Sequence, residues 1–146
     1  MSHVHDILKV KSNNVYSVKP QDTAYDTLKL MAEKNIGAVI VLEGEKIAGI
    51  FSERDFARHA VKSSQGPKDV LIKDIMTSKT LSTVTPDTTT DECMTLMTAK
   101  HIRHLPVLEH GKLVGLISIG DVVKRIIEDH KFSITQLERY VTGEAS

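Results

Sequence analysis

The 146-residue sequence contains few of the residues that build disulfide scaffolds, metal clusters or charged surfaces. It has one cysteine, no tryptophan and no surplus of either charge, since 19 basic residues balance 19 acidic ones. A single cysteine excludes an internal disulfide and a cysteine-cluster zinc site. Neutrality argues against a surface for duplex nucleic acid, although it leaves room for a local basic pocket that binds a small anion.

Long apolar segments and catalytic motifs are missing as well. No apolar run approaches the roughly 18 residues that a membrane span needs, and the first residues lack the apolar core of a signal peptide. We therefore expect a cytoplasmic protein without a membrane partner. There is no Ser-His-Asp set, no Walker loop and no acid and base pair in a catalytic motif, so we do not expect an enzyme.

What the sequence does contain is an internal repeat. Shifted by 66 residues, positions 18–58 align without a gap with positions 84–124, and 14 of the 41 pairs are identical. The identical pairs include Pro20 with Pro86 and Gly49 with Gly115. Agreement on this scale is far beyond an accident of composition and indicates a tandem duplication.

Each copy predicts the element order β-α-β-β-α. The expected elements are an extended segment, a helix capped by Thr23 or Thr89, two short apolar strands around a Gly-containing turn, and a closing helix. We place the strands and the closing helix at residues 15–18, 38–42, 47–51 and 54–62 in the first copy, and at 81–84, 105–108, 113–117 and 120–129 in the second. The first helix of each copy opens at Thr23-x-x-Asp26 or at Thr89-x-x-Glu92. Because a unit of about 55 residues with three small strands hardly makes a core alone, the α/β (α+β) fold should pack both copies with pseudo-two-fold symmetry.

The repeat also sets the expected boundaries. We assign residues 1–66 to the first repeat with its N-terminal segment, 67–130 to the second repeat, and 131–146 to a C-terminal helical tail. In this tail Ser133-x-x-Gln136 has the spacing of a cap for a separate last helix. That helix would pack on its own chain or form a subunit contact, and the periodicity does not separate the two.

One motif occurs at the same place in both copies: Gly, two apolar residues, Ser, two further residues and Asp. It spans residues 49–55 and 115–121. A glycine in a strand lets another backbone or a flat ligand approach closely. The carboxylate and the first amides of a helix suit ribose hydroxyls and phosphate. The alternative is structural, because Ser-x-x-Asp is also the spacing of a capping box.

Two other groups of residues are weaker candidates. His3-x-His5 and His101-x-x-His104 have spacings found in metal sites, but we expect no metal there because cysteine or carboxylate ligands are not seen nearby. Cys93 lies near a helix start without an activating cation, so we expect a small buried side chain.

Both repeats resemble CBS domains, the family named after cystathionine β-synthase. The resemblance is carried by Asp74-Ile75-Met76-Thr77, by Arg103-His104-Leu105-Pro106-Val107 and by the two Gly-to-Asp motifs. It implies a Bateman module, in which adenosine compounds such as AMP, ADP, ATP, NAD(H) or S-adenosylmethionine bind in two clefts between the repeats. It also implies a homodimer that senses energy or redox state and regulates a separate protein, such as a thioredoxin-system or metabolic enzyme.

The resemblance further implies which residues bind the nucleotide. Asp55 and Asp121 would bind ribose hydroxyls, with Ser52 and Ser118 near ribose or phosphate. The other members of the set would border the base or the phosphates: Tyr16, Val18, Ile36, Gly37, Ala38, Arg54, Ser82, Val84, Ile102, Arg103, His104, Pro106 and Gly120.

The two implied sites differ in charge. The second has Arg103 and His104 where the first has Gly37 and Ala38, whereas the first has Arg54 where the second has a glycine. Cations complement phosphate, and Lys124 and Arg125 would extend the second cluster. The sequence leaves open which site is occupied. Two other functions also stay open: a dimerisation module with empty clefts, and a nucleotide-processing enzyme.

Overall fold

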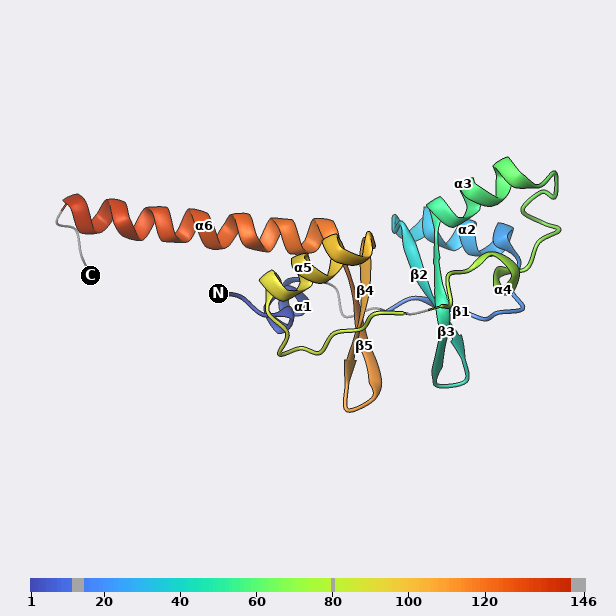
Figure 1. Ribbon diagram of the computed structural model, residues 1–146, viewed down its shortest axis with the longest axis horizontal. Helices are drawn as coiled ribbons and strands as arrows, with labels where there is room; N and C mark the ends of the chain where they lie inside the picture. Colours follow the sequence, from blue (N-terminus) through green and yellow to red (C-terminus); the bar gives the residue numbers. More distant parts are fainter. Residues whose placement is uncertain (12–14, 80, 143–146) are drawn as a thin grey trace. The chain divides into compact units, whose positions relative to one another are not determined.

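The two copies of the repeat form separate packing units in the computed structural model, which describes residues 1–11, 15–79 and 81–142 (Figure 1). The first-repeat unit comprises Asn14–Leu81. The second-repeat unit comprises Met1–Asn13 together with Ser82–Ser146. Each unit therefore has its own sheet, helices and core, and the mixed α/β class expected from the repeat is confirmed.

The first-repeat unit is a small three-stranded sheet with its helices. Strand β2 lies between β1, to which it is parallel, and β3, to which it is antiparallel. Thr23 caps the first helix of the repeat, as expected, because its hydroxyl accepts a hydrogen bond from the Asp26 amide. The elements are β1 (Ser17–Val18), α2 (Ala24–Lys34), β2 (Ala38–Glu43), β3 (Lys46–Ser52), α3 (Glu53–Lys62) and α4 (Ile72–Ile75).

The second-repeat unit repeats this pattern with one strand fewer. Thr89 caps its first helix through the Glu92 amide, and β4 pairs antiparallel with β5 in the register that β2 and β3 have. Both hairpins carry an irregularity at the same place, after Val41 and after Val107. The elements are α1 (Val4–Val10), α5 (Thr90–Lys100), β4 (His104–Glu109), β5 (Lys112–Ser118) and α6 (Ile119–Thr142).

The strand expected at residues 81–84 forms only one bridge, between Val84 and Val107. Val84 donates to the Pro106 carbonyl and accepts from the Leu108 amide. The next bond of a parallel ladder would run from residue 106 to the carbonyl of Ser82, and proline has no N–H to donate. In the first repeat Ile40 occupies that place, and the pairing extends to Ser17.

Each unit is completed by a short helix that precedes the other repeat in the sequence. Helix α4 joins the first-repeat unit, where Lys73 donates to the Pro20 carbonyl, and α1 joins the second, where His5 donates to the Pro86 carbonyl. We call residues 1–11 and 70–77 the lead-ins. The boundaries of the packing units therefore differ from the repeat boundary expected between residues 66 and 67. The lead-in 1–11 packs on the second repeat, and the lead-in 70–77 packs on the first.

The apolar residues of the predicted helices fill the two cores. Met31 and Phe51 are buried in the first-repeat unit, and Cys93, Met97 and Val122 are buried in the second. The lead-ins contribute to the same clusters, through Val4 and Ile7 in one unit and through Val70 and Ile72 in the other. The expected small, buried cysteine is thereby confirmed.

The C-terminal tail is helical to Thr142, as predicted, but it continues the closing helix of the second repeat and is not a separate helix. Helix α6 runs without interruption over 24 residues, and the Ser133 hydroxyl donates to the Asp129 carbonyl one turn earlier instead of capping a new helix. Neither glycine nor proline lies between residues 121 and 142, so nothing in the backbone ends the helix there. Within the described part of the chain, no helix is both long and apolar enough to cross a membrane.

Candidate functional site

Both Ser-x-x-Asp segments lie where a strand passes into a helix, and both form reciprocal caps. The Ser52 amide donates to Asp55 Oδ2 at 2.9 Å, while the Asp55 amide donates to the Ser52 hydroxyl at 3.2 Å. The corresponding distances for Ser118 and Asp121 are 2.8 and 3.1 Å. The capping box is therefore present, and it fixes each carboxylate at the end of a strand.

The carboxylate of Asp55 is enclosed by groups of its own unit. The hydroxyls of Thr77 and Ser52 donate to its two oxygens, both at 3.1 Å, and Arg58 Nη1 lies 3.6 Å from Oδ1. The side chain is only 8% exposed. Both oxygens have donors from the protein, so a ligand would have to displace one of them.

Asp121 is more open and has a different neighbour. Its side chain is 27% exposed, and the ammonium group of Lys11 donates to Oδ2 at 2.6 Å and to the Leu116 carbonyl at 2.7 Å. Burial alone would raise the pKa of Asp121, but hydrogen bonds from Lys11 and Ser118 hold the pKa below its usual value. The carboxylate is therefore kept ionised, in the form that only accepts hydrogen bonds.

The glycines of the motif make room for the lead-ins. A Cβ atom on Gly49 would lie 2.7 Å from the Thr77 carbonyl oxygen, and one on Gly115 would lie 2.7 Å from Leu8 Cδ2. Of the two expected reasons for a strand glycine, close approach of another backbone is the one found at Gly49. Thr77 pairs there with Ile50 through two backbone hydrogen bonds of 2.8 and 2.9 Å.

The segment before β2 and the segment before β4 each lie beside the motif of the same unit. The Gly37 carbonyl accepts from the Glu53 amide at 3.2 Å, and the Arg103 carbonyl accepts from the Ile119 amide at 2.8 Å. In the first-repeat unit the carboxylate of Glu53 comes near Gly37. The apolar Ile119 takes that place in the second-repeat unit, where the exposed Arg103 supplies positive charge.

The remaining predicted residues divide by burial. Arg54, Gly37 and Gly120 are exposed, and Tyr16 is partly buried with Lys34 Nζ 5.3 Å from its ring centroid. Both backbone groups of Val84 are used within the sheet. The partly buried members are Ile36, Ser82, Ile102 and His104, and the buried members are Val18, Ala38, Val84 and Pro106.

Arg125 does not extend a phosphate-binding cluster, contrary to the expectation. Its Nε donates to the Ser2 hydroxyl at 3.0 Å, and its Nη2 donates to Asp129 Oδ1 at 3.3 Å. Burial acts to raise the pKa of Asp129, but bonds from Ser2 and Arg125 lower it below its usual value. The guanidinium group is therefore used to fix the start of the chain on α6.

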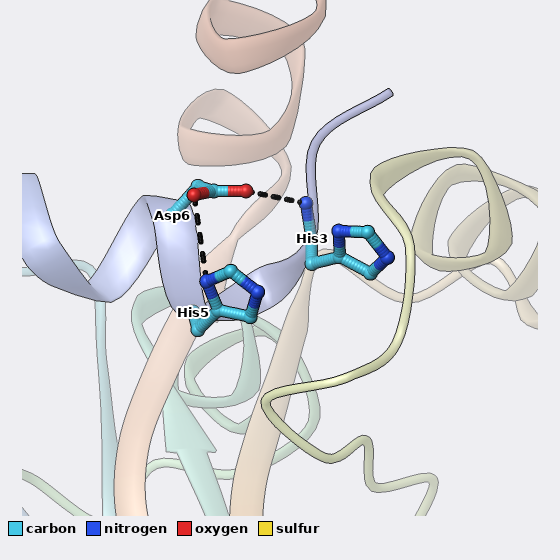
Figure 2. Close-up of side chains that lie close together, drawn as sticks. All are labelled: His3, His5 and Asp6. Carbon is cyan, nitrogen blue, oxygen red and sulfur yellow. Dashed lines mark hydrogen bonds and ion pairs between the residues drawn. The ribbon is translucent and has the colours of Figure 1, made fainter.

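His3, His5 and Asp6 form a cluster at the start of α1 whose candidate ligand atoms lie within 4.8 Å of one another (Figure 2). The view that no carboxylate lies near these histidines is corrected, because Asp6 pairs with His5 Nδ1 at 3.4 Å. Its other oxygen accepts from the His3 amide, a bond that lowers the pKa of Asp6. The imidazole rings stack with 5° between their planes, so their in-plane lone pairs do not converge on one point. This geometry caps the helix.

Two residues that contact the motif were missed as site residues by the sequence analysis. Thr77 lies 22 positions from Asp55, and in the sequence analysis it is named only as the last residue of the segment Asp74-Ile75-Met76-Thr77. Lys11 lies 110 positions from Asp121, and no local pattern marks it. Both belong to lead-ins, so only the packing of these segments brings them to the carboxylates.

Comparison with known proteins agrees with this arrangement. The CBS domain family model matches residues 4–62 and 72–128. A mitochondrial CBS domain-containing protein of Arabidopsis thaliana, CBSX3, is 35% identical over 96% of this chain and 72% of its own length. A putative signal-transduction protein with CBS domains from Burkholderia ambifaria has a TM-score of 0.83 and 50% identity, covering 88% of this chain and 96% of the other. CBSX2, whose structure was solved in complex with AMP, has a TM-score of 0.71 and 24% identity over 89% of this chain and 99% of the other.

Proposed function

The chain belongs to the CBS domain family, and from this membership we propose that it is a non-catalytic regulatory module that binds an adenosine-type ligand. The candidate ligands are AMP, ADP, ATP and NAD(H), and the bound state changes the behaviour of a separate partner protein. The AMP complex of CBSX2 supports this ligand class, since that protein has the same fold. Binding works as a signal because a ligand that prefers one arrangement of the protein shifts the population towards it.

The observation that carries the proposal is the state of Asp121. This carboxylate is held ionised at a strand end, more than a quarter of its side chain is exposed, and its backbone cap fixes its direction. An ionised carboxylate accepts hydrogen bonds from ribose hydroxyls, as in dinucleotide sites. The exposed Arg103 lies on the segment beside it and offers a guanidinium group for phosphate.

The same argument ranks the second-repeat site above the first. Asp55 has donors on both oxygens and little exposure, and Glu53 places negative charge beside Gly37. A phosphate group beside Gly37 would be repelled by this carboxylate. This feature favours an empty first site. It is the specific observation that supports part of the alternative, a dimerisation module with empty clefts.

The test is calorimetric titration of ligand-stripped protein with AMP, ADP, ATP, NAD+, NADH and S-adenosylmethionine, supported by thermal denaturation. A ligand at 100 times its dissociation constant adds about 2.7 kcal/mol, which raises the melting temperature by several degrees. No heat of binding and no shift with any of these compounds would overturn the proposal. Conversion of the nucleotide during titration would favour the enzyme instead.

Asp121→Asn and Asp55→Asn form a matched pair, because asparagine keeps a side-chain oxygen that can accept the backbone N–H of Ser118 or Ser52 while the charge is removed. Hydrogen bonds to a charged group contribute about 1.5–3 kcal/mol, so Asp121→Asn should weaken binding by about 10- to 150-fold. Asp55→Asn should leave the affinity within about threefold of the unchanged protein. A reversed order would assign the ligand to the first-repeat unit.

Other parts of the proposal follow from the family alone. We expect a homodimer whose regulated partner is a thioredoxin-system protein or another metabolic enzyme; the cytoplasmic location rests on the sequence analysis instead. Affinity capture with and without the identified nucleotide tests the partner, because a regulatory module should hold it differently in the two conditions. Equal capture in both conditions would remove the regulatory role while leaving nucleotide binding in place.

A further inference from the structure

Helix α6 exposes a row of apolar side chains along most of its length, and its own unit does not cover them. Val122 is fully buried against the core, but Val123 and Ile127 on another face are 39% and 48% exposed. Further along, Ile134, Leu137 and Val141 are 55–82% exposed. In Figure 1 the last turns of α6 extend beyond α5 and α1, the helices of the same unit. A single helix without a packing partner is only marginally stable in water, so this segment calls for one.

The row has the spacing of a coiled coil. Successive members lie 4, 3, 4, 3 and 4 positions apart, which is the heptad pattern of a seam along one side of a helix. The core positions of a heptad form two alternating sets. One set here consists of the β-branched Ile127, Ile134 and Val141, and the other of Val123, His130 and Leu137. We call this row the seam; its members are Val123, Ile127, His130, Ile134, Leu137 and Val141.

We propose that the seam packs against the seam of a second copy of this chain, with the two α6 helices antiparallel. In this register every seam residue has a counterpart: Ile127 lies opposite Leu137 of the second copy, and Val123 lies opposite Val141. His130 faces Ile134 of the second copy, so the two imidazoles do not meet. All six layers are filled by the same six residues, which is what an interface between identical helices requires.

Charges beside the seam favour the antiparallel orientation. Lys124 flanks one end and Glu138 the other, both exposed, so antiparallel packing brings Lys124 next to Glu138 of the second copy twice. In a parallel pair these residues would lie about four turns apart, and His130 would face its own copy across the core. Flanking charges set the orientation of coiled coils, and opposite charges in contact stabilise the pair.

The seam lies on the same helix as Asp121 but uses other residues, and the proposal does not depend on nucleotide binding. It is tested on the full chain by disulfide cross-linking, which reports the seam itself even if the protein dimerises through another surface as well. Cys93 does not interfere, because it is fully buried and burial raises the pKa of its thiol to about 11. The unchanged protein is therefore the blank.

Two variants are made, His130→Cys and Ile134→Cys, one of them carrying a mass tag. When the two are mixed and oxidised, the covalent heterodimer should form at least tenfold faster than either homodimer. Phe132→Cys is the matched control, because this side chain is 66% exposed on the same helix but lies off the seam. It should give no product above the blank.

Reversal of the flanking charges adds an independent arm. Lys124→Glu in both partners should slow heterodimer formation by about 3- to 10-fold, and adding Glu138→Lys should restore it, since exposed pairs contribute about 0.2–1 kcal/mol each. Absence of cross-linking in the mixture at micromolar concentrations would overturn the self-association. Preferred homodimers of His130→Cys, or no rescue by the second reversal, would overturn the antiparallel orientation.

Discussion

Replacement of Gly49 by alanine tests the placement of the lead-in on the first-repeat unit. The added Cβ would lie 2.7 Å from the Thr77 carbonyl oxygen and 2.9 Å from Met76 Sδ. Ordinary contact begins at 3.4 Å, so the Met76–Thr77 backbone must withdraw by 3.4 minus 2.7, or 0.7 Å. That movement strains the two hydrogen bonds between Thr77 and Ile50. Overpacking of this kind costs about 1–3 kcal/mol, together with part of the roughly 1 kcal/mol that each bond contributes.

Alanine also restricts the unfolded chain, which offsets about 0.4–1 kcal/mol. The net loss in free energy of unfolding should be about 1–3 kcal/mol, measured by urea denaturation followed by far-ultraviolet circular dichroism. Gly115→Ala is the control, because its Cβ meets Leu8 Cδ2, the end of a flexible side chain that can turn away. It should cost less than about 1 kcal/mol. A Gly49→Ala variant as stable as the unchanged protein, or equal losses at both glycines, would refute the reasoning.

Three further outcomes are expected. Asp121 has a folded pKa below its ordinary value of 3.8, so the stability that it contributes is present above that value and is lost as the pH falls through the folded pKa. Lys11→Ala should therefore flatten the acid side of a plot of unfolding free energy against pH. An unchanged plot would contradict the ion pair between Lys11 and Asp121. Cys93 should resist a thiol reagent at pH 8 until urea unfolds the protein, whereas immediate full reaction would show that the thiol is accessible. Ser2→Ala removes bonds to Asp129 and Arg125 and should lower the unfolding free energy by about 1–2 kcal/mol in urea melts, a loss that a loosely attached N-terminus would not show.

The elements that were predicted correctly depend on local patterns. Thr23 and Thr89 mark helix starts because a hydroxyl at that position meets an amide three residues later. The strands follow apolar runs around Gly44 and Gly111, which have positive φ angles of 64° and 77°. Such signals need only a few neighbouring residues, so sequence alone reveals them.

The elements that were missed depend on distant partners. Pro106 reads as an ordinary residue of a buried strand, and only its place opposite Val84 shows that its lack of an N–H shortens the ladder. Lys11 is one of 19 basic residues until α1 packs beside Asp121. The same holds for the candidate site. The Ser-x-x-Asp motifs could be recognised in the sequence, but the groups that donate hydrogen bonds to their carboxylates from distant segments could not.

The packing of the lead-ins also has a consequence for how the polypeptide matures. Helix α1 leaves the ribosome before β4, β5 and α6, with which it forms a unit, and the whole first repeat is synthesised in between. The buried Val4 and Ile7 therefore stay uncovered until the second repeat has emerged, whereas the first-repeat unit can close once α4 has emerged. Expression of the two halves cut at residue 66 would leave each half without its own lead-in. Mixing the two halves would give each unit its lead-in again. The protein should therefore fold when both halves are present together, but each half should be unstable when it is expressed alone.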